Sequence, residues 1–89
     1  MAEEELSYDA ILRAEIAFDL INQARAIVTA RVYELEDVDP GAAEELRRRR
    51  RELIELQQSI SVADRDTAEN LIALWGPRVR DIARFWAEF

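Results

Sequence analysis

Residues 7–37 read SYDAILRAEIAFDLINQARAIVTARVYELED and contain neither glycine nor proline. Apolar side chains recur along this stretch in alternating steps of three and four residues, the spacing of one face of an α-helix. A second apolar stripe lies beside the first when successive residues are turned by about 100°, so the stretch predicts one long helix with a wide apolar arc that must be covered on more than one side. The two stripes are Ile11, Ala14, Phe18, Ile21, Val28, Val32 and Leu35, and Leu12, Ile16, Leu20 and Ile27, and the polar strip left between them is Glu15, Asp19, Asn22, Thr29 and Tyr33.

The chain after this helix carries signals for three further helices. Asp39 followed by Pro40 is a helix start, because aspartate caps the first N–H groups and proline needs none at the first helical position. The short connection before it predicts an antiparallel hairpin, with a second helix over residues 40–60. A third helix is predicted over 65–75. Gly76 would cap its end and Pro77 would open a fourth helix over 77–89, while residues 1–6 are expected to be a frayed acidic lead-in.

These elements predict a single all-α domain over residues 1–89, in which two short C-terminal helices pack over one end of a long antiparallel helical hairpin. A chain of 89 residues supplies only a modest core. The wide apolar arc of the first helix therefore favours a dimeric helical bundle, in which a second copy completes the cover. The residues predicted to mediate this self-association are Phe18, Ile21, Arg25 and Val28.

Pairing the hairpin outward from its turn predicts which residues of the two long helices face each other. It places Phe18 near Gln57 and Arg25 near Arg50. Two facing guanidinium groups in an apolar seam are unfavourable unless an acid or an anion lies between them. The prediction is therefore that a carboxylate arrives from elsewhere or that the register is shifted by one turn.

The composition excludes most catalytic and metal chemistry. Without cysteine or histidine, the chain has no disulfide, thiol catalysis, imidazole acid–base chemistry or common zinc site. Carboxylates alone remain, and no acid in an apolar helix position has a second acid one turn away, so we expect no enzymatic activity and no cofactor. The acidic N-terminus and the lack of a long apolar run favour a cytoplasmic protein without membrane contact. All 12 basic residues are arginine, which we interpret as the codon bias of a GC-rich bacterial genome.

Five consecutive arginines occupy residues 47–51. On a helix they point around the whole circumference, so they do not form one patch. Acids lie four residues away from several of them, and each such pair is worth about 0.2–0.5 kcal/mol. The predicted pairs are Glu44–Arg48, Glu45–Arg49, Arg48–Glu52 and Arg51–Glu55. The run predicts a salt-bridged solvated face; contact with a protein partner is the alternative, and a net charge of −7 disfavours direct nucleic-acid binding.

The C-terminal segment 75–89 contains both tryptophans and two of the three phenylalanines. One interpretation is that these aromatics close the end of the bundle. The other is an exposed binding surface, because tryptophan and arginine are enriched at interaction hot spots. The partner-binding residues predicted on this second interpretation are Arg80, Arg84, Phe85, Trp86 and Phe89.

The leading hypothesis for function is a small non-catalytic regulatory protein that self-associates and binds another protein through its helical surfaces. The alternative is an acidic inhibitor that mimics nucleic acid and blocks a DNA- or RNA-binding enzyme, as anti-restriction and anti-CRISPR proteins of mobile elements do. The acids that would carry this mimicry are Glu15, Asp19, Glu34 and Glu36. The residues carry no motif from which we assign a family.

Overall fold

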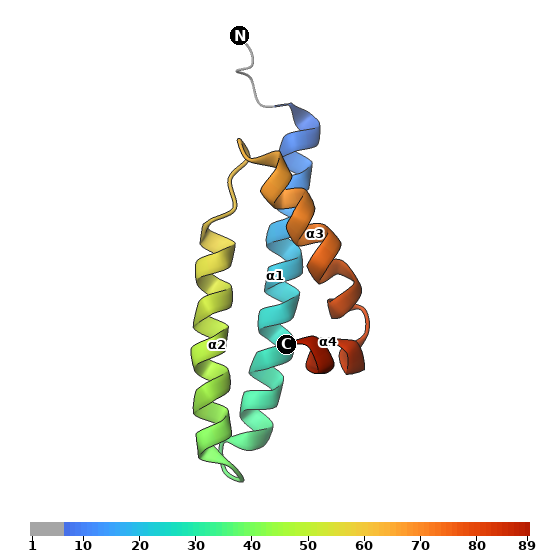
Figure 1. Cartoon of the computed structure of the whole chain (residues 1–89). Helices are drawn as coiled ribbons and strands as arrows, with labels where there is room; N and C mark the ends of the chain where they lie inside the picture. The colour runs from blue at the N-terminus through green and yellow to red at the C-terminus, as the bar shows by residue number, and fades with distance from the viewer. Residues whose placement is uncertain (1–6) are drawn as a thin grey trace.

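The computed structural model describes residues 7–89, and this part of the chain is all-α. Its helices are α1 (Tyr8–Leu35), α2 (Pro40–Gln58), α3 (Arg65–Val79) and α4 (Ile82–Glu88). In Figure 1, α1 runs through the middle with α2 on one side and α3 on the other. The predicted all-α class and the packing of the first two helices are thus confirmed. None of the described helices is long and apolar enough to cross a lipid bilayer.

The two long helices begin where capping side chains place them. The hydroxyl of Ser7 accepts a hydrogen bond of 3.0 Å from the backbone N–H of Ala10 at the start of α1. The carboxylate of Asp39 accepts one of 3.2 Å from the backbone N–H of Ala42 at the start of α2, and Pro40 is the first helical residue. Both caps satisfy backbone donors that have no partner within the helix. The start signals of these helices are therefore read correctly from the sequence.

The predicted break between the last two helices at Gly76 and Pro77 is wrong. Helix α3 continues through both residues to Val79, and the chain breaks at Asp81 instead. The carboxylate of Asp81 accepts a hydrogen bond of 3.2 Å from the backbone N–H of Arg84 and thereby starts α4. Pro77 lies in the last turn of α3, where a proline removes one hydrogen bond without ending the helix.

Gly76 lies inside α3 and does not have the predicted capping role. Its backbone does not adopt a positive φ, and the residue is buried. A Cβ atom added to it would lie 3.9 Å from the Cδ1 atom of Leu20 on α1. The packing of α3 on α1 therefore does not require a glycine at this position.

The core follows one line of small and medium side chains along α1. Its buried residues are Ala14, Ala17, Ile21, Ala24, Val28 and Val32. Ala43 and Leu53 bury against this line from α2, and Ala68, Leu71 and Trp75 from α3. The C-terminal aromatics complete the core, because Phe85 is fully buried, with its ring centre 6.2 Å from that of Trp75.

Arginines of α1 and α2 hold the C-terminal end of the chain in place. The guanidinium of Arg31 lies 4.4 Å from the ring centre of Trp86, and that of Arg49 lies 3.9 Å from the ring centre of Phe89. Arg49 also donates a hydrogen bond to the carbonyl oxygen of Phe89. These cation–π contacts join α4 to both long helices.

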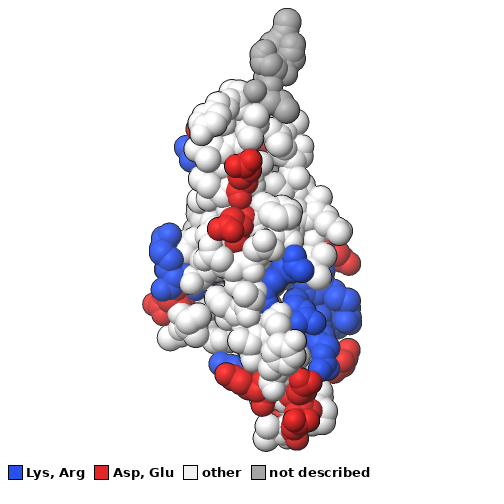
Figure 2. Space-filling view, turned by 180° about the vertical axis from the view of Figure 1, so that it is seen from behind, with Lys and Arg blue, Asp and Glu red and all other residues white. Residues whose placement is uncertain are grey.

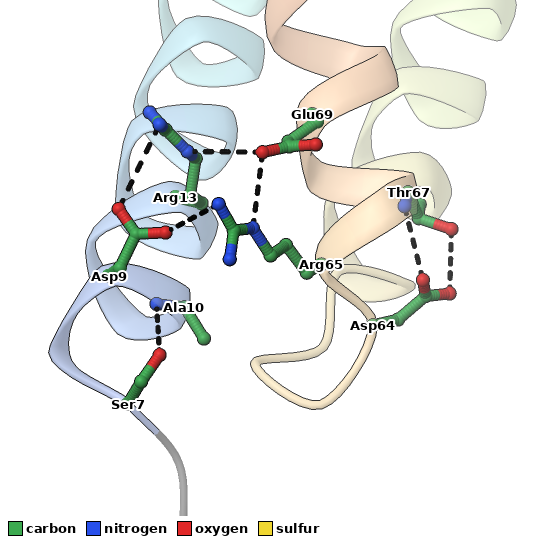
Figure 3. A network of polar contacts seen from close by, with 8 residues as sticks. All are labelled: Ser7, Asp9, Ala10, Arg13, Asp64, Arg65, Thr67 and Glu69. Atoms are coloured by element: carbon green, nitrogen blue, oxygen red, sulfur yellow. Dashed lines mark hydrogen bonds and ion pairs between the residues drawn. The ribbon is translucent and has the colours of Figure 1, made fainter.

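An ion-pair network joins the beginnings of α1 and α3 (Figure 3). Arg65 contacts Asp9 at 2.8 Å and Glu69 at 3.1 Å, and Arg13 contacts Glu69 at 3.4 Å. The four side chains alternate in charge, so each carboxylate lies between two guanidinium groups. These ion pairs therefore connect α3 to α1 at the end of α1 that lies opposite the hairpin turn.

We expect Phe85→Ala to lower the free energy of unfolding by about 3–5 kcal/mol, because truncating a buried phenylalanine loses its apolar burial and leaves a cavity. Leu74→Ala is the matched control: Leu74 is 49% exposed on α3, so this truncation should cost about 1 kcal/mol or less. Urea unfolding followed by circular dichroism measures both. Equal losses for the two variants would show that the aromatic cluster is not part of the core.

Candidate protein-interaction surface

A groove follows the boundary between α1 and α2 on the side of α1 that neither α2 nor α3 covers. Its volume is about 630 Å³. We call it the arginine groove; its lining residues are Asn22, Arg25, Ala26, Thr29, Ala30, Tyr33, Arg50 and Ile54. Figure 2 shows a group of basic residues on the α2 side of the back of the molecule, with acidic residues above and below it.

Gln57 lies next to this groove and forms hydrogen bonds with two of its lining residues, Asn22 and Arg25. It is 3% exposed, and its amide Nε2 donates to the carbonyl oxygen of Phe18 and to Oδ1 of Asn22, both at 3.0 Å. Its Oε1 accepts a hydrogen bond of 2.6 Å from the Arg25 guanidinium. The predicted proximity of Phe18 and Gln57 is therefore confirmed, and the register of the hairpin holds.

The two arginines of the groove donate hydrogen bonds to amide and hydroxyl oxygens, and to no carboxylate within residues 7–89. Arg25 donates to Gln57 and, at 3.3 Å, to Asn22, while Arg50 donates to the hydroxyl of Thr29 at 2.8 Å. Within residues 7–89 neither guanidinium lies within ion-pair distance of an acid. The prediction of an intervening carboxylate or a shifted register is thus wrong, because amide and hydroxyl oxygens orient both groups without cancelling their charge.

The Arg25 side chain also retains an unsatisfied donor. Its Nε atom is buried and has no hydrogen-bond partner in the described part of the chain. A cation held in a partly dehydrated position interacts more strongly with an arriving anion than a fully solvated one does. The groove therefore presents two oriented positive charges in a protein whose net charge is −7.

A second, smaller groove lies on the other flank of α1 and has a volume of about 350 Å³. We call it the Trp86 groove; its lining residues are Ala26, Ile27, Ala30, Arg31, Glu34, Ile82 and Trp86. It shares Ala26 and Ala30 with the arginine groove. The two grooves therefore flank a low ridge of small side chains on α1, which another helix could approach closely.

The segment predicted to bind a partner lies partly inside the molecule. Phe85 is fully buried, and Phe89 stacks on it with a distance of 5.0 Å between ring centres. Arg84 pairs with Glu88, whereas Arg80 is exposed. Trp86 is half-buried and lines the Trp86 groove, so only the edge of this aromatic cluster faces solvent.

The residues predicted for self-association lie in two different environments. Ile21 and Val28 are fully buried in the core of the chain itself, so a second copy has no access to them in this fold. The reason is that α2 and α3 together enclose the face of α1 that carries both residues. Phe18 is 46% exposed, and Arg25 lines the arginine groove.

The arginine run makes some of its predicted ion pairs and replaces others. The Arg48–Glu52 pair is present at 2.6 Å. Arg48 also pairs with Glu45, three residues before it, and the hydrogen bond from Arg48 lowers the pKa of the Glu45 carboxyl. Arg47 contacts Glu44 at 3.2 Å. Helix geometry allows three-residue as well as four-residue partners, and the Phe89 contact draws Arg49 away from Glu45.

The four acids proposed for nucleic-acid mimicry differ in how they are paired. Glu34 contacts Arg31 at 3.1 Å, and Glu36 contacts Arg47 at 3.8 Å. Asp19 accepts a hydrogen bond of 2.9 Å from the amide of Gln23. Glu15 is exposed, and no ion pair joins it to another residue of the 7–89 range.

Three residues of the predicted polar strip line the arginine groove. They are Asn22, Thr29 and Tyr33, which share one face of α1. Sequence spacing identifies the strip, but it does not show that α2 supplies Arg50 beside it. Among the described residues, no group of three or more acids lies close enough together to hold a metal ion.

Comparison with known proteins returned no match: no family model, curated protein or solved structure is significantly similar to the chain.

Replacing Gln57 tests the hydrogen bonds that this side chain forms next to the arginine groove. Gln57→Leu keeps the size of the side chain but leaves the Arg25 guanidinium and the Phe18 carbonyl without their buried partner. We expect the free energy of unfolding to fall by about 1–3 kcal/mol, measured by urea unfolding. Gln58→Leu, at an exposed position one residue further on, is the control and should change it by less than about 0.5 kcal/mol.

Glu88 provides a test of pH dependence. Hydrogen bonds from Arg78 (2.9 Å) and Arg84 (3.0 Å) lower the pKa of the Glu88 carboxyl below its ordinary value of 4.5. A carboxyl with a lowered pKa in the folded state stabilises that state above pH 4.5, and the stabilisation is lost as pH falls through the lowered value.

We therefore expect Glu88→Gln to lower the melting temperature at pH 6 and to have a smaller effect at pH 3. Glu55→Gln, which removes an exposed charge that no arginine of the described chain contacts, controls for the change of net charge. Thermal unfolding of the three proteins at the two pH values measures the difference. An equal effect of Glu88→Gln at both values would contradict the assigned ion pairs.

Proposed function

We propose that this chain is a small non-catalytic interaction protein that binds an acidic surface of a partner protein in the arginine groove. The observation that carries the proposal is the pair Arg25 and Arg50, both oriented by neutral side chains and neither neutralised by an acid within residues 7–89. Both arginines are partly buried, and a guanidinium group forms strong, often bidentate hydrogen bonds with a carboxylate, so an acid of a partner protein would suit this position.

The contact surface extends from this groove over the alanine ridge to the Trp86 groove. Trp86 and Ile82 of the C-terminal segment then form its far edge together with Arg31 of α1. Ile82 is 52% exposed. An apolar centre with an arginine and a tryptophan at its border has the composition of an interaction hot spot.

The alternative function is an acidic inhibitor that mimics nucleic acid. Only two of the four acids proposed for this mimicry support it. Arg31 and Arg47 neutralise Glu34 and Glu36, which leaves Glu15 and Asp19 without an arginine partner in the described chain. Two carboxylates on one face of a helix offer little of the regular charge of a nucleic-acid strand. We therefore favour the arginine groove as the contact surface.

Affinity capture from cells of the source organism tests the proposal. We expect a specific protein to co-purify with the wild type, to be lost with Arg25→Glu or Arg50→Glu, and to remain with Arg51→Glu. Arg51 belongs to the same arginine run, but it is exposed and does not line the groove, so it is the matched control. Circular dichroism confirms that each variant is folded.

Two results would overturn the proposal. Retention of the co-purified protein by both groove variants would show that the groove is not the contact. Loss of that protein with Glu15→Gln and Asp19→Asn, together with its displacement by duplex DNA or RNA, would favour nucleic-acid mimicry.

A further inference from the structure

We infer that the arginine groove recognises a second copy of this chain, bound antiparallel, with Glu15 of each copy reaching Arg50 of the other. The inference rests on the proposed function, because it names the partner of the same groove. It also differs from a dimer through the buried residues of α1, since Ile21 and Val28 are enclosed by the chain itself.

One strip of α1 is uncovered along the length of the helix, and we call it the seam. Its residues recur in alternating steps of three and four, so they share one face of the helix. They are Leu12, Glu15, Asp19, Asn22, Ala26, Thr29 and Tyr33. No helix of the described chain covers this seam, so it is open to a second molecule.

The two halves of this seam carry opposite charge. Glu15 and Asp19 occupy the first half, and neither lies within ion-pair distance of an arginine in the part of the chain that the structure describes. Arg25 and Arg50 flank the second half, likewise without a carboxylate. A parallel pair of copies would place like charges opposite each other, whereas an antiparallel pair brings each acidic half over a basic half.

A two-fold axis beside Asn22 brings the matching groups to the same level. Glu15 and Thr29 both lie seven residues from Asn22, about 10 Å along the helix, so Glu15 of one copy faces Thr29 of the other. The Arg50 guanidinium donates to the Thr29 hydroxyl at 2.8 Å. The carboxylate therefore arrives beside an arginine that is already oriented, and the symmetry makes the contact twice.

The same axis pairs exposed apolar residues with suitable neighbours. Phe18 and Ala26 each lie four residues from Asn22, so the 46% exposed Phe18 packs onto a small side chain. Ile11 and Tyr33 each lie eleven residues away, and they are 37% and 71% exposed. Because α2 flanks the seam on one side, the two α1–α2 hairpins would form a four-helix bundle.

Light scattering after size-exclusion chromatography tests the inference with the full chain. We expect the wild type to have about twice the chain mass of 10.3 kDa. Arg50→Glu and Glu15→Arg should each run as single chains, because each places like charges in both copies of the contact. Arg51→Glu is the matched control and should keep the wild-type mass.

Mixing the two single-chain variants gives the decisive result. In a mixed dimer, Glu15 of the Arg50→Glu variant meets Arg50 of the other, and the introduced arginine meets the introduced glutamate. We therefore expect the equimolar mixture to regain the double mass while each variant alone does not. A circular dichroism spectrum of each variant confirms that loss of mass is not loss of fold.

A wild type of single-chain mass at all concentrations overturns the inference, as does a double mass that both variants keep or that mixing fails to restore. A single-chain wild type that still captures another protein through Arg50 overturns self-recognition alone and leaves the proposed function standing. If that capture is also insensitive to Arg50, the proposed function fails as well.

Discussion

The packing of α3 against the small side chains of α1 is the contact on which the rest of the structure depends. Ala17 and Ala24 of α1 are fully buried, and Ala68, Leu71 and Trp75 of α3 belong to the same core. Without this close approach, one face of α1 would remain open to water along much of its length. With it, a chain of 89 residues covers both sides of its longest helix and forms a core of its own.

The position of α3 also determines the role of the C-terminal aromatics. Because α3 continues to Val79, α4 begins late and turns back, so that Phe85 enters the core. Arg31 and Arg49 then stack on Trp86 and Phe89 from the two long helices. This segment has the composition of a binding hot spot, but most of its aromatic surface packs inside the protein, and only its outer edge faces solvent.

Charge is distributed unevenly over this acidic molecule. Most acids near the hairpin turn and the C-terminal end have an arginine partner, as Glu36 and Glu88 do. On the uncovered side of α1, in contrast, neutral oxygens orient Arg25 and Arg50 while Glu15 remains apart from them. Charges that could neutralise each other are kept separate within one chain by the rigidity of the helix, and this separation is what a second molecule could relieve.

Local signals in the sequence were sufficient for the all-α class, the hairpin and the starts of the long helices, because helix spacing and capping involve residues only a few positions apart. The register of the hairpin could also be predicted, because the short turn allows few alternative pairings of the two helices. Phe18 does lie beside Gln57. The end of α3 could not be predicted in this way, because glycine and proline near a helix end are compatible both with a break and with a helix that continues, and here α3 continues to Val79.

The sequence by itself therefore determined the helices of this protein, their hairpin and their polar and apolar strips. Only the tertiary structure decided which strips are covered: α3 buries Ile21 and Val28, and α2 places Arg50 beside Thr29. The physical reason is that capping and periodicity act within one or two helical turns. Burial and the pairing of charges depend on residues that are distant in the chain and meet only after folding.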